Sequence, residues 1–298
     1  MYTYIAYGLN IHSFIEFPEL VSCDVTTADV QVKLEKLYSS PIKDASQSYS
    51  FQATTEGLYL FWQEIGTILI SNGREIIVDP IINFEESRLR LFILGAAMGT
   101  ILHQRGYIVL HASAVSLKNN AVVFTADKGR GKSTMAAILH ERGHNLIADD
   151  VVAIDFEDNG KPIVYPAFPQ LKLWPDAVTH LGKNLQDLPQ LTTKFNKREY
   201  LPKENFTTKS LILKQIFVLS HGSEIAIKSL SFQEVMMYLL RNTYVSRFGS
   251  SLLPSNNPSH FINLTKLAKS VRIDRLIRPN SLELLSNVAQ EVETYLLK

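Results

Sequence analysis

Residues 124–150, FTADKGRGKSTMAAILHERGHNLIADD, combine residue types that bind phosphate. Residues 126–133 read ADKGRGKS and fit the template G-x-x-x-x-G-K-[ST] except at the first position, where alanine replaces glycine. Gly129 and Gly131 let consecutive backbone amides turn inward on an anion, and a helix starting near Lys132 adds its positive dipole end. We predict a nucleotide-phosphate loop here; a glycine-rich turn that opens a core helix is the alternative interpretation.

Each position of this loop has an expected role. Lys132 would neutralise the β and γ phosphates, and the Ser133 hydroxyl would be a Mg²⁺ ligand, with Thr134 as a neighbour of similar chemistry. Ala126 can replace glycine if its φ angle is negative. The apolar run AVVFT predicts a strand leading in, and STMAAILHER a helix leading out. The predicted nucleotide-binding residues are Asp127, Lys128, Gly129, Arg130, Gly131, Lys132, Ser133 and Thr134.

Two adjacent carboxylates, Asp149 and Asp150, follow Lys132 by 17 and 18 positions. We expect their strand to lie directly beside the strand that enters the loop, so that the pair ends near the phosphates. A carboxylate there can bind Mg²⁺, and a second can accept a proton from an attacking hydroxyl. Neighbouring strand residues point to opposite faces, so only one acid would face the γ phosphate. A solvated strand end is the alternative.

The order of these motifs resembles a known family. LHASAV, the glycine loop and RGHNLIADD, within residues 107–155, are similar to the C-terminal catalytic domain of HPr kinase/phosphorylase, a bacterial protein-serine kinase whose fold is shared with phosphoenolpyruvate carboxykinase. We find no counterpart of the glycine-rich signature that the bifunctional enzymes carry further downstream. Residues 1–80 and FPQLKLWPD resemble the HPr-kinase-like proteins encoded with lasso-peptide genes, which phosphorylate the C-terminal serine of a precursor peptide.

The resemblance implies roles for matching positions. Lys132 and Ser133 become the nucleotide and magnesium residues, Asp149 the catalytic base toward the acceptor serine, and His111 a histidine close to the phosphates; Asp150 becomes a metal or structural carboxylate. By its residue type alone, His111 would be a core histidine. The implied cofactors are ATP and Mg²⁺. The implied partner is a peptide or small protein with an acceptor serine, and a homo-oligomer is expected by family analogy.

Other side chains are weaker candidates. A cation should meet the charge on the transferred phosphoryl group, and the candidates are Lys128, Arg130, Lys194, Lys197, Arg198, Arg241 and Arg247, with the two loop residues first. A basic cluster of Lys194, Lys197, Arg198, Lys203 and Lys209 could receive an acidic acceptor or be an exposed loop. His103, His144 and His180 lack metal-ligand spacing, so no zinc site is expected. Trp62 and Trp174 are interpreted as core or interface aromatics.

The surrounding pattern predicts how these residues are held. Residues 1–84 are expected to form a β-rich domain, with a hairpin whose turn is Asn72-Gly73. Residues 85–106 are predicted to be a connecting helix that ends at Gly106.

Residues 107–298 are expected to form an α/β kinase domain of the phosphoenolpyruvate-carboxykinase-like type. Its predicted strands are 107–115, 121–126, 145–155 and 210–220. The proline-rich run 165–176 and the polar run 192–209 are expected to be loops, and a closing helix is expected to begin at Asn280 with Glu283 as its capping partner.

Composition limits the class of protein. The 298 residues contain 30 basic and 29 acidic side chains, so no global charge favours nucleic acid or an anionic membrane. Cys23 is the only cysteine, which excludes an internal disulfide and favours a reducing compartment. The N-terminus lacks a signal-peptide pattern, and the most apolar run, LFILGAAMGTIL, is too short to span a bilayer. A cytoplasmic protein is expected.

Three functions compete on the sequence. The leading hypothesis is an ATP-dependent kinase acting on a serine hydroxyl, most specifically the C-terminal serine of a lasso-peptide precursor; an HPr-type protein-serine kinase/phosphorylase is the related alternative. The second is a P-loop ATPase or nucleotide switch. The third, a small-molecule kinase, should carry an arginine-rich lid, which residues 194–209 only loosely suggest.

Overall fold

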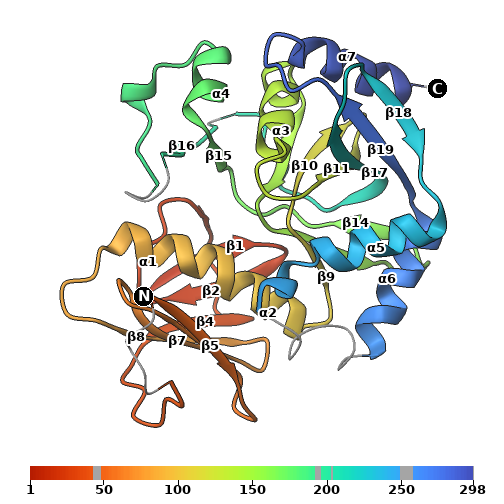
Figure 1. The fold of residues 1–298 in the computed structure, drawn as a ribbon. Helices are drawn as coiled ribbons and strands as arrows, with labels where there is room; N and C mark the ends of the chain where they lie inside the picture. Colours follow the sequence, from red (N-terminus) through yellow and green to blue (C-terminus); the bar gives the residue numbers. More distant parts are fainter. Residues whose placement is uncertain (43–47, 192–195, 203, 249–257, 298) are drawn as a thin grey trace.

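The computed structural model describes residues 1–42, 48–191, 196–202, 204–248 and 258–297 and contains two main β-sheets with helices around them (Figure 1). The first is an eight-stranded sheet formed by the N-terminal part of the chain, in the order β3-β1-β2-β4-β8-β7-β6-β5. Its strands are β1 (Tyr2–Ala6), β2 (Leu9–Ser13), β3 (Val21–Ser22), β4 (Val30–Leu34), β5 (Tyr49–Ala53), β6 (Leu58–Trp62), β7 (Gly66–Ser71) and β8 (Glu75–Pro80). The chain between Tyr2 and Pro80 is therefore rich in β-strands.

The predicted hairpin joins β7 to β8. Asn72 and Gly73 both have positive φ, 55° and 60°, as a type I′ turn requires, and the Arg74 amide donates to the Ser71 carbonyl at 3.0 Å. Asparagine and glycine tolerate this conformation at low cost, so the local sequence is sufficient to set the turn.

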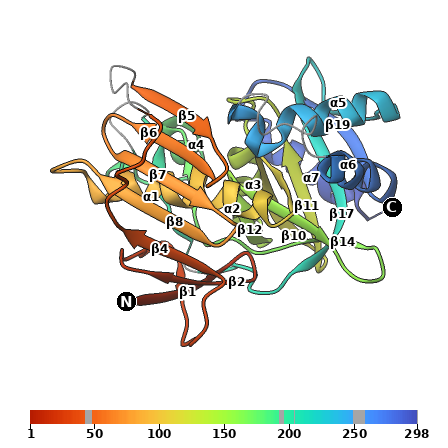
Figure 2. The ribbon, with the colours of Figure 1, turned by 90° about the horizontal axis from the view of Figure 1, so that it is seen from below.

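The predicted connecting helix is a continuous helical run with a wider turn in the middle. It consists of α1 (Glu86–Phe92), the π-helical η1 (Ile93–Ala97) and α2 (Met98–Gln104), and Gly106 follows with φ 91°. The π turn was not expected from the sequence. Figures 1 and 2 show this run between the N-terminal sheet and the rest of the molecule.

The second sheet contains nine strands. Its main order is β12-β10-β11-β17-β14-β13-β9, and β19 pairs with both β17 and β18. The strands are β9 (Ile108–Leu110), β10 (Ala112–Leu117), β11 (Asn120–Thr125), β12 (Asn145–Asp149), β13 (Val152–Phe156), β14 (Pro162–Val164), β17 (Leu211–His221), β18 (Ala226–Ser229) and β19 (Arg272–Arg278).

Helices pack on the second sheet to form two cores. Buried residues of α3 (Lys132–Glu141) and α7 (Leu285–Tyr295) form one core with β11, β17 and β19. The other core includes α5 (Phe232–Asn242), α6 (Pro258–Ser270), the connecting helix and the N-terminal sheet. Because this second core is continuous across both sheets, the N-terminal sheet is packed against the rest of the chain.

Two predicted strands are interrupted. Residues 107–115 divide into β9 and β10 at His111, and residues 145–155 divide into β12 and β13 at Asp150, which has φ 72°. The expectation that β12 lies directly beside β11 is wrong, because β10 lies between them. Both breaks occur where the chain passes from one part of the sheet to another.

The C-terminal half contains further differences from the expectations. The run 165–176 includes β15 (Leu171–Leu173) and the start of α4 (Pro175–His180), and β15 pairs with β16 (Arg198–Tyr200). Two short 3-10 helices, η2 (Leu185–Asp187) and η3 (Tyr244–Phe248), complete the elements. The closing helix α7 begins at Leu285, not at Asn280, because residues 280–284 form a turn first. In the part of the chain that the structure describes, no helix is long and apolar enough to span a membrane.

Candidate active site

The glycine loop, residues 126–131, connects β11 to the start of α3. Gly129 and Gly131 have φ angles of 83° and 87°, a region that glycine enters without strain. Ala126 is 2% exposed and does not have a positive φ, so alanine is compatible with the first position, as predicted. A Cβ at Gly131 would collide with the guanidinium of Arg278, which donates to the Arg130 carbonyl at 3.1 Å.

Lys132 lies folded over this loop at the N-terminus of α3. Its Nζ donates to the carbonyls of Ala126 at 3.0 Å and Asp127 at 3.3 Å, and the residue is only 7% exposed. Burial lowers the pKa of Lys132 to about 8, against the opposing influence of the nearby acids. The loop therefore holds a partly desolvated cation that an incoming phosphate would stabilise.

Asp149, the last residue of β12, is held by two neutral donors. Its Oδ1 accepts a hydrogen bond from the Ser113 hydroxyl at 2.6 Å, and its Oδ2 accepts one from the Lys172 backbone amide at 2.9 Å. The carboxylate is 6% exposed and still borders the pocket. Each carboxylate oxygen has a second lone pair, so Asp149 keeps the capacity to accept another proton donor.

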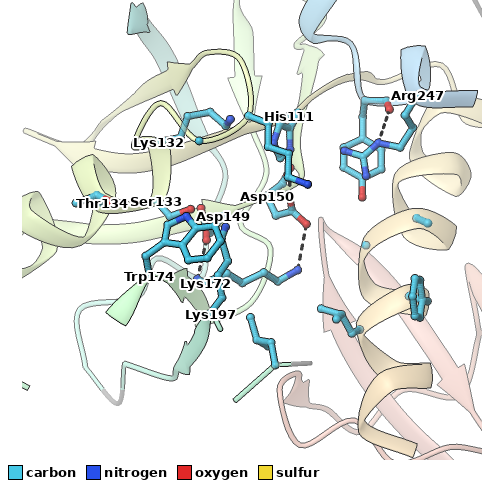
Figure 3. A pocket seen from close by; sticks show the side chains of 18 of the residues that line it. His111, Lys132, Ser133, Thr134, Asp149, Asp150, Lys172, Trp174, Lys197 and Arg247 are labelled. Atoms are coloured by element: carbon cyan, nitrogen blue, oxygen red, sulfur yellow. Dashed lines mark hydrogen bonds and ion pairs between the residues drawn. The ribbon is translucent and has the colours of Figure 1, made fainter. Parts of the chain in front are cut away.

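Asp150, which follows β12 with a φ of 72°, has a different environment. Its oxygens pair with His111 Nδ1 and Lys172 Nζ, each at 3.0 Å (Figure 3). Burial raises the pKa of Asp150, but Lys172, His111 and Arg247 outweigh it and hold that pKa well below its ordinary value. Both acids therefore line the pocket. Which of them would face a γ phosphate stays a prediction.

A cavity of about 590 Å³ unites these groups. One part is polar, with the glycine loop, both acids, Lys172 and Lys197. The other part is apolar and is formed by the N-terminal sheet, the connecting helix and η3. The lining residues of the apolar part are Tyr49, Trp62, Leu91, Phe92, Gly95, Ala96 and Tyr244.

The connecting helix approaches the site closely because it carries glycine where it meets Tyr244. A Cβ at Gly99 would lie 2.5 Å from the Tyr244 ring, and one at Gly95 would lie 3.3 Å from the Tyr244 hydroxyl. Arg247 lies over this ring, with its guanidinium 3.6 Å from the ring centroid and Nε donating to the Tyr244 carbonyl at 3.0 Å. Stacking and the hydrogen bond hold this cation at the pocket rim.

The structure brings most of the predicted site residues to this pocket. Asp127 and Arg130 do not line it: Asp127 pairs with Arg241 at 3.4 Å, and Arg130 contacts Arg278 through its carbonyl. The predicted residues that do line it are His111, Lys128, Gly129, Gly131, Lys132, Ser133, Thr134, Asp149 and Asp150. Their chemical roles stay predictions.

The candidate cations divide in the same way. Lys128, Lys197 and Arg247 line the pocket, whereas Arg198, Lys209 and Arg241 do not. Lys194 and Lys203 lie outside the described residues. The expected basic cluster of residues 194–209 is therefore represented at the pocket by Lys197 alone among the described residues.

Sequence reasoning missed Lys172. Lys172 lies between two buried leucines of β15, and this alternation was a strand signal within a run predicted to be a loop. Trp62 packs against the core and also lines the pocket, and Trp174, which is 39% exposed, lines the pocket as well. Trp174 lines the same pocket as Ser133 and Asp149 (Figure 3).

The oxygen donors of the pocket suit a hard cation such as Mg²⁺. Ser133 and Asp150 offer a hydroxyl and a carboxylate, the ligand types that magnesium prefers. Within the described ranges, no three histidine, cysteine, aspartate or glutamate residues are grouped closely enough to hold a metal by themselves. A magnesium ion here would therefore depend on phosphate oxygens for much of its coordination, as it does in many nucleotide sites.

Comparison with known proteins gives a short match in sequence. The chain is 40% identical over 58 residues to HPr kinase/phosphorylase of Chlorobaculum tepidum, a match that spans 20% of this chain and 17% of that relative. No protein-family model matches the chain.

The fold comparison matches the HPr(Ser) kinase/phosphatase of Coxiella burnetii over 64% of this chain and 99% of that one, with 12% identity and a TM-score of 0.32. The chain is thus a mixed α/β protein with a segment similar to an HPr kinase/phosphorylase.

Proposed function

We propose that this protein is an ATP-dependent kinase that transfers the γ-phosphoryl group to a serine hydroxyl of a peptide or small protein. The observation that carries the proposal is the convergence of the glycine loop, Lys132 and the two acids on one cavity. The 58-residue similarity to an HPr kinase/phosphorylase supports the same chemistry. This similarity favours a protein acceptor of the HPr type, and no comparison supports the narrower expectation of a lasso-peptide precursor.

In this proposal the nucleotide binds along the glycine loop. The backbone amides around Gly129 and Gly131 receive the phosphates, together with the dipole of α3 and the Lys132 ammonium. Phosphate binding would exchange the two carbonyl contacts of Lys132 for charge-assisted bonds to phosphate oxygens. Ser133 and Asp150 would hold Mg²⁺, which neutralises charge on the phosphates when bound.

Asp149 is the proposed base toward the acceptor hydroxyl. The Ser113 and Lys172 donors fix its carboxylate, and its remaining lone pairs can receive the serine proton. Lys172 and Arg247 are proposed to offset charge on the transferred group, because both lie at the pocket and both are held in place by neighbours. Positioning and electrostatics supply most of the rate gain in phosphoryl transfer.

The test is to incubate the protein with Mg²⁺, γ-labelled ATP and serine-containing peptides or HPr, and to follow the label. Label on serine supports the kinase, and release only as inorganic phosphate would favour the ATPase or switch. We expect Asp149→Asn to reduce transfer by about 100-fold or more while ATP affinity stays within about threefold. Asp150→Asn is the matched comparison and should raise the magnesium concentration needed for half-maximal transfer. Full transfer activity in Asp149→Asn would contradict the base assignment.

A further inference from the structure

The apolar part of the cavity contains a group of aromatic and aliphatic side chains that ATP chemistry does not require. We call this group the apolar wall and define it as Tyr49, Trp62, Leu91, Phe92, Gly95 and Ala96. Ring centroids are 4.3 Å apart between Trp62 and Phe92 and 5.2 Å apart between Tyr49 and Trp62. Tyr49, Trp62 and Phe92 are all half-buried, so parts of their rings remain open to the cavity.

The wall begins next to the acid pair. A Cβ at Gly95 would lie 3.9 Å from Asp150 Oδ2, which is ordinary contact distance. One residue of an extended peptide spans about 3.3–3.6 Å. A serine whose hydroxyl reaches the acids would therefore place the side chain of a neighbouring residue against the wall.

The location favours the acceptor over the nucleobase as the occupant. In phosphoryl transfer the acceptor oxygen attacks roughly in line, from the side opposite the leaving β-phosphate oxygen. Figure 3 shows Asp150 and Lys172 between Lys132 on one side and the connecting helix on the other. The wall therefore lies beyond the acids as seen from the glycine loop, where an acceptor would approach.

The positive charges at the pocket rim would also select acceptor peptides by their charge. Arg247 stacks on Tyr244, and Lys197 lies over the Trp174 ring at 5.5 Å, so both cations border the same cavity. A segment with an acidic residue elsewhere in its sequence is compatible with this rim, whereas a basic segment is repelled.

From this arrangement we infer that the apolar wall is the acceptor subsite, and that it takes an aromatic or large aliphatic side chain within two residues of the acceptor serine. The inference rests on the proposed kinase function and names its substrate class. Burial of one such side chain supplies both affinity and placement of the hydroxyl at the acids.

The test measures binding separately from transfer. Fluorescein-labelled nine-residue peptides, each with one central serine and with Phe, Leu or Ala at the next position, are titrated with protein and followed by fluorescence anisotropy. We expect the Phe and Leu peptides to bind about 10- to 100-fold more tightly than the Ala peptide. A Phe peptide that carries one aspartate away from the serine should bind more tightly than the same peptide with lysine at that position.

Two variants of opposite kind change the wall. Trp62→Ala removes a ring and Ala96→Leu fills space beside it, and both should reduce the Phe-over-Ala preference to about threefold or less. Phe14→Ala is the control, because Phe14 is a 63% exposed aromatic residue near the N-terminal sheet that does not line the cavity. Thermal unfolding and ATP affinity are measured for each variant to show that it is folded. If only one of the two wall variants folds, its peptide preference is sufficient for the test.

The outcomes are distinguishable. Equal binding of the three peptides by the unmodified protein would overturn the subsite. Loss of ATP affinity in both wall variants, with the peptide preference intact, would assign the wall to the nucleobase and also overturn it. If the preference is present but no label reaches serine, the kinase proposal fails and the peptide subsite stands.

Discussion

The glycine loop and the acid pair border the same cavity but are held in place differently. The loop is a local structure: residues 126–131 are set by two glycines with positive φ and by the helix that follows. The acid pair depends on distant segments, since Asp150 contacts His111 and Lys172, and Asp149 contacts Ser113. Local sequence therefore determines where phosphate would bind, and tertiary packing determines where the acids point.

The largest expected effect is on ATP affinity and comes from a substitution in the glycine loop. Gly131→Ala strains the backbone at φ 87° and displaces the Arg278 guanidinium from the Arg130 carbonyl, so we expect ATP affinity to fall by about 100-fold or more, about 2.7 kcal/mol. Gly143→Ala is the control at the other end of α3, with φ 92° and no atom within 4 Å of the added Cβ. It should cost about 1 kcal/mol of stability and leave ATP affinity unchanged. Calorimetric titration with ATP and urea unfolding measure both, and normal ATP affinity in Gly131→Ala would refute the loop assignment.

Breaking the contacts that hold the acid pair should lower the free energy of unfolding. Lys172→Met removes one cation from Asp150 while keeping the backbone amide that binds Asp149, and should cost about 1–3 kcal/mol of unfolding free energy. In the double variant with Asp150→Asn the costs should not add, because the two side chains share one interaction. Lys36→Met, which breaks the exposed pair with Asp79, is the control and should leave the unfolding transition nearly unchanged.

The sign of the pH dependence follows from the lowered pKa of Asp150. A depressed carboxyl pKa stabilises the fold above its unfolded value of about 3.9, and this stabilisation is lost as pH falls through the lower folded pKa. The difference between the unmodified protein and Lys172→Met should therefore be largest near neutral pH and narrow in acid. Urea unfolding at pH 7 and pH 3 measures it, and an equal difference at both would contradict the ion-pair account.

The same contrast explains what the sequence could predict. The hairpin at Asn72-Gly73 follows from short-range preferences and was predicted correctly, and the positive φ angles of Gly129 and Gly131 follow from the same kind of preference. The breaks at His111 and Asp150 were missed, because apolar residues resume directly after each polar position and only the change of strand partner marks the break.

The residues that reach the cavity from distant segments were harder to predict from the sequence. Lys172 reaches Asp150 across 22 positions, and Tyr49 and Trp62 reach the cavity from the other sheet. No local sequence pattern predicts these positions, because they depend on how the two sheets pack. The one usable signal was Leu-Lys-Leu at 171–173, an alternation that places the lysine on the face opposite two buried leucines.

Lys132 links the glycine loop to the acid pair, because it belongs to the loop and its ammonium group is buried near both acids. Its pKa of about 8 means that folding disfavours its charge, so Lys132→Met should raise stability at pH 7 by about 1–3 kcal/mol while weakening ATP binding. The unmodified protein gains stability as pH rises from about 8 toward 10.5, where the folded lysine is neutral and the unfolded one is still protonated. The advantage of the variant should therefore shrink over that range in urea unfolding. An advantage that grows with pH would show that burial of charge is not the cause.

The smallest expected effect concerns the departure of Ala126 from the glycine template. Ala126 is buried and does not need a positive φ, so Ala126→Gly should not improve the loop. Glycine adds backbone freedom to the unfolded chain and removes a packed methyl group, so we expect a loss of about 1 kcal/mol in stability and an ATP affinity within about threefold of the original. Urea unfolding and calorimetric titration of the same samples measure both quantities. A large gain in ATP affinity would mean that the loop must bend further around the phosphates than it does here. The conformation of the bound loop would then depend on contacts with distant segments, as the acid pair does, and not on local sequence alone.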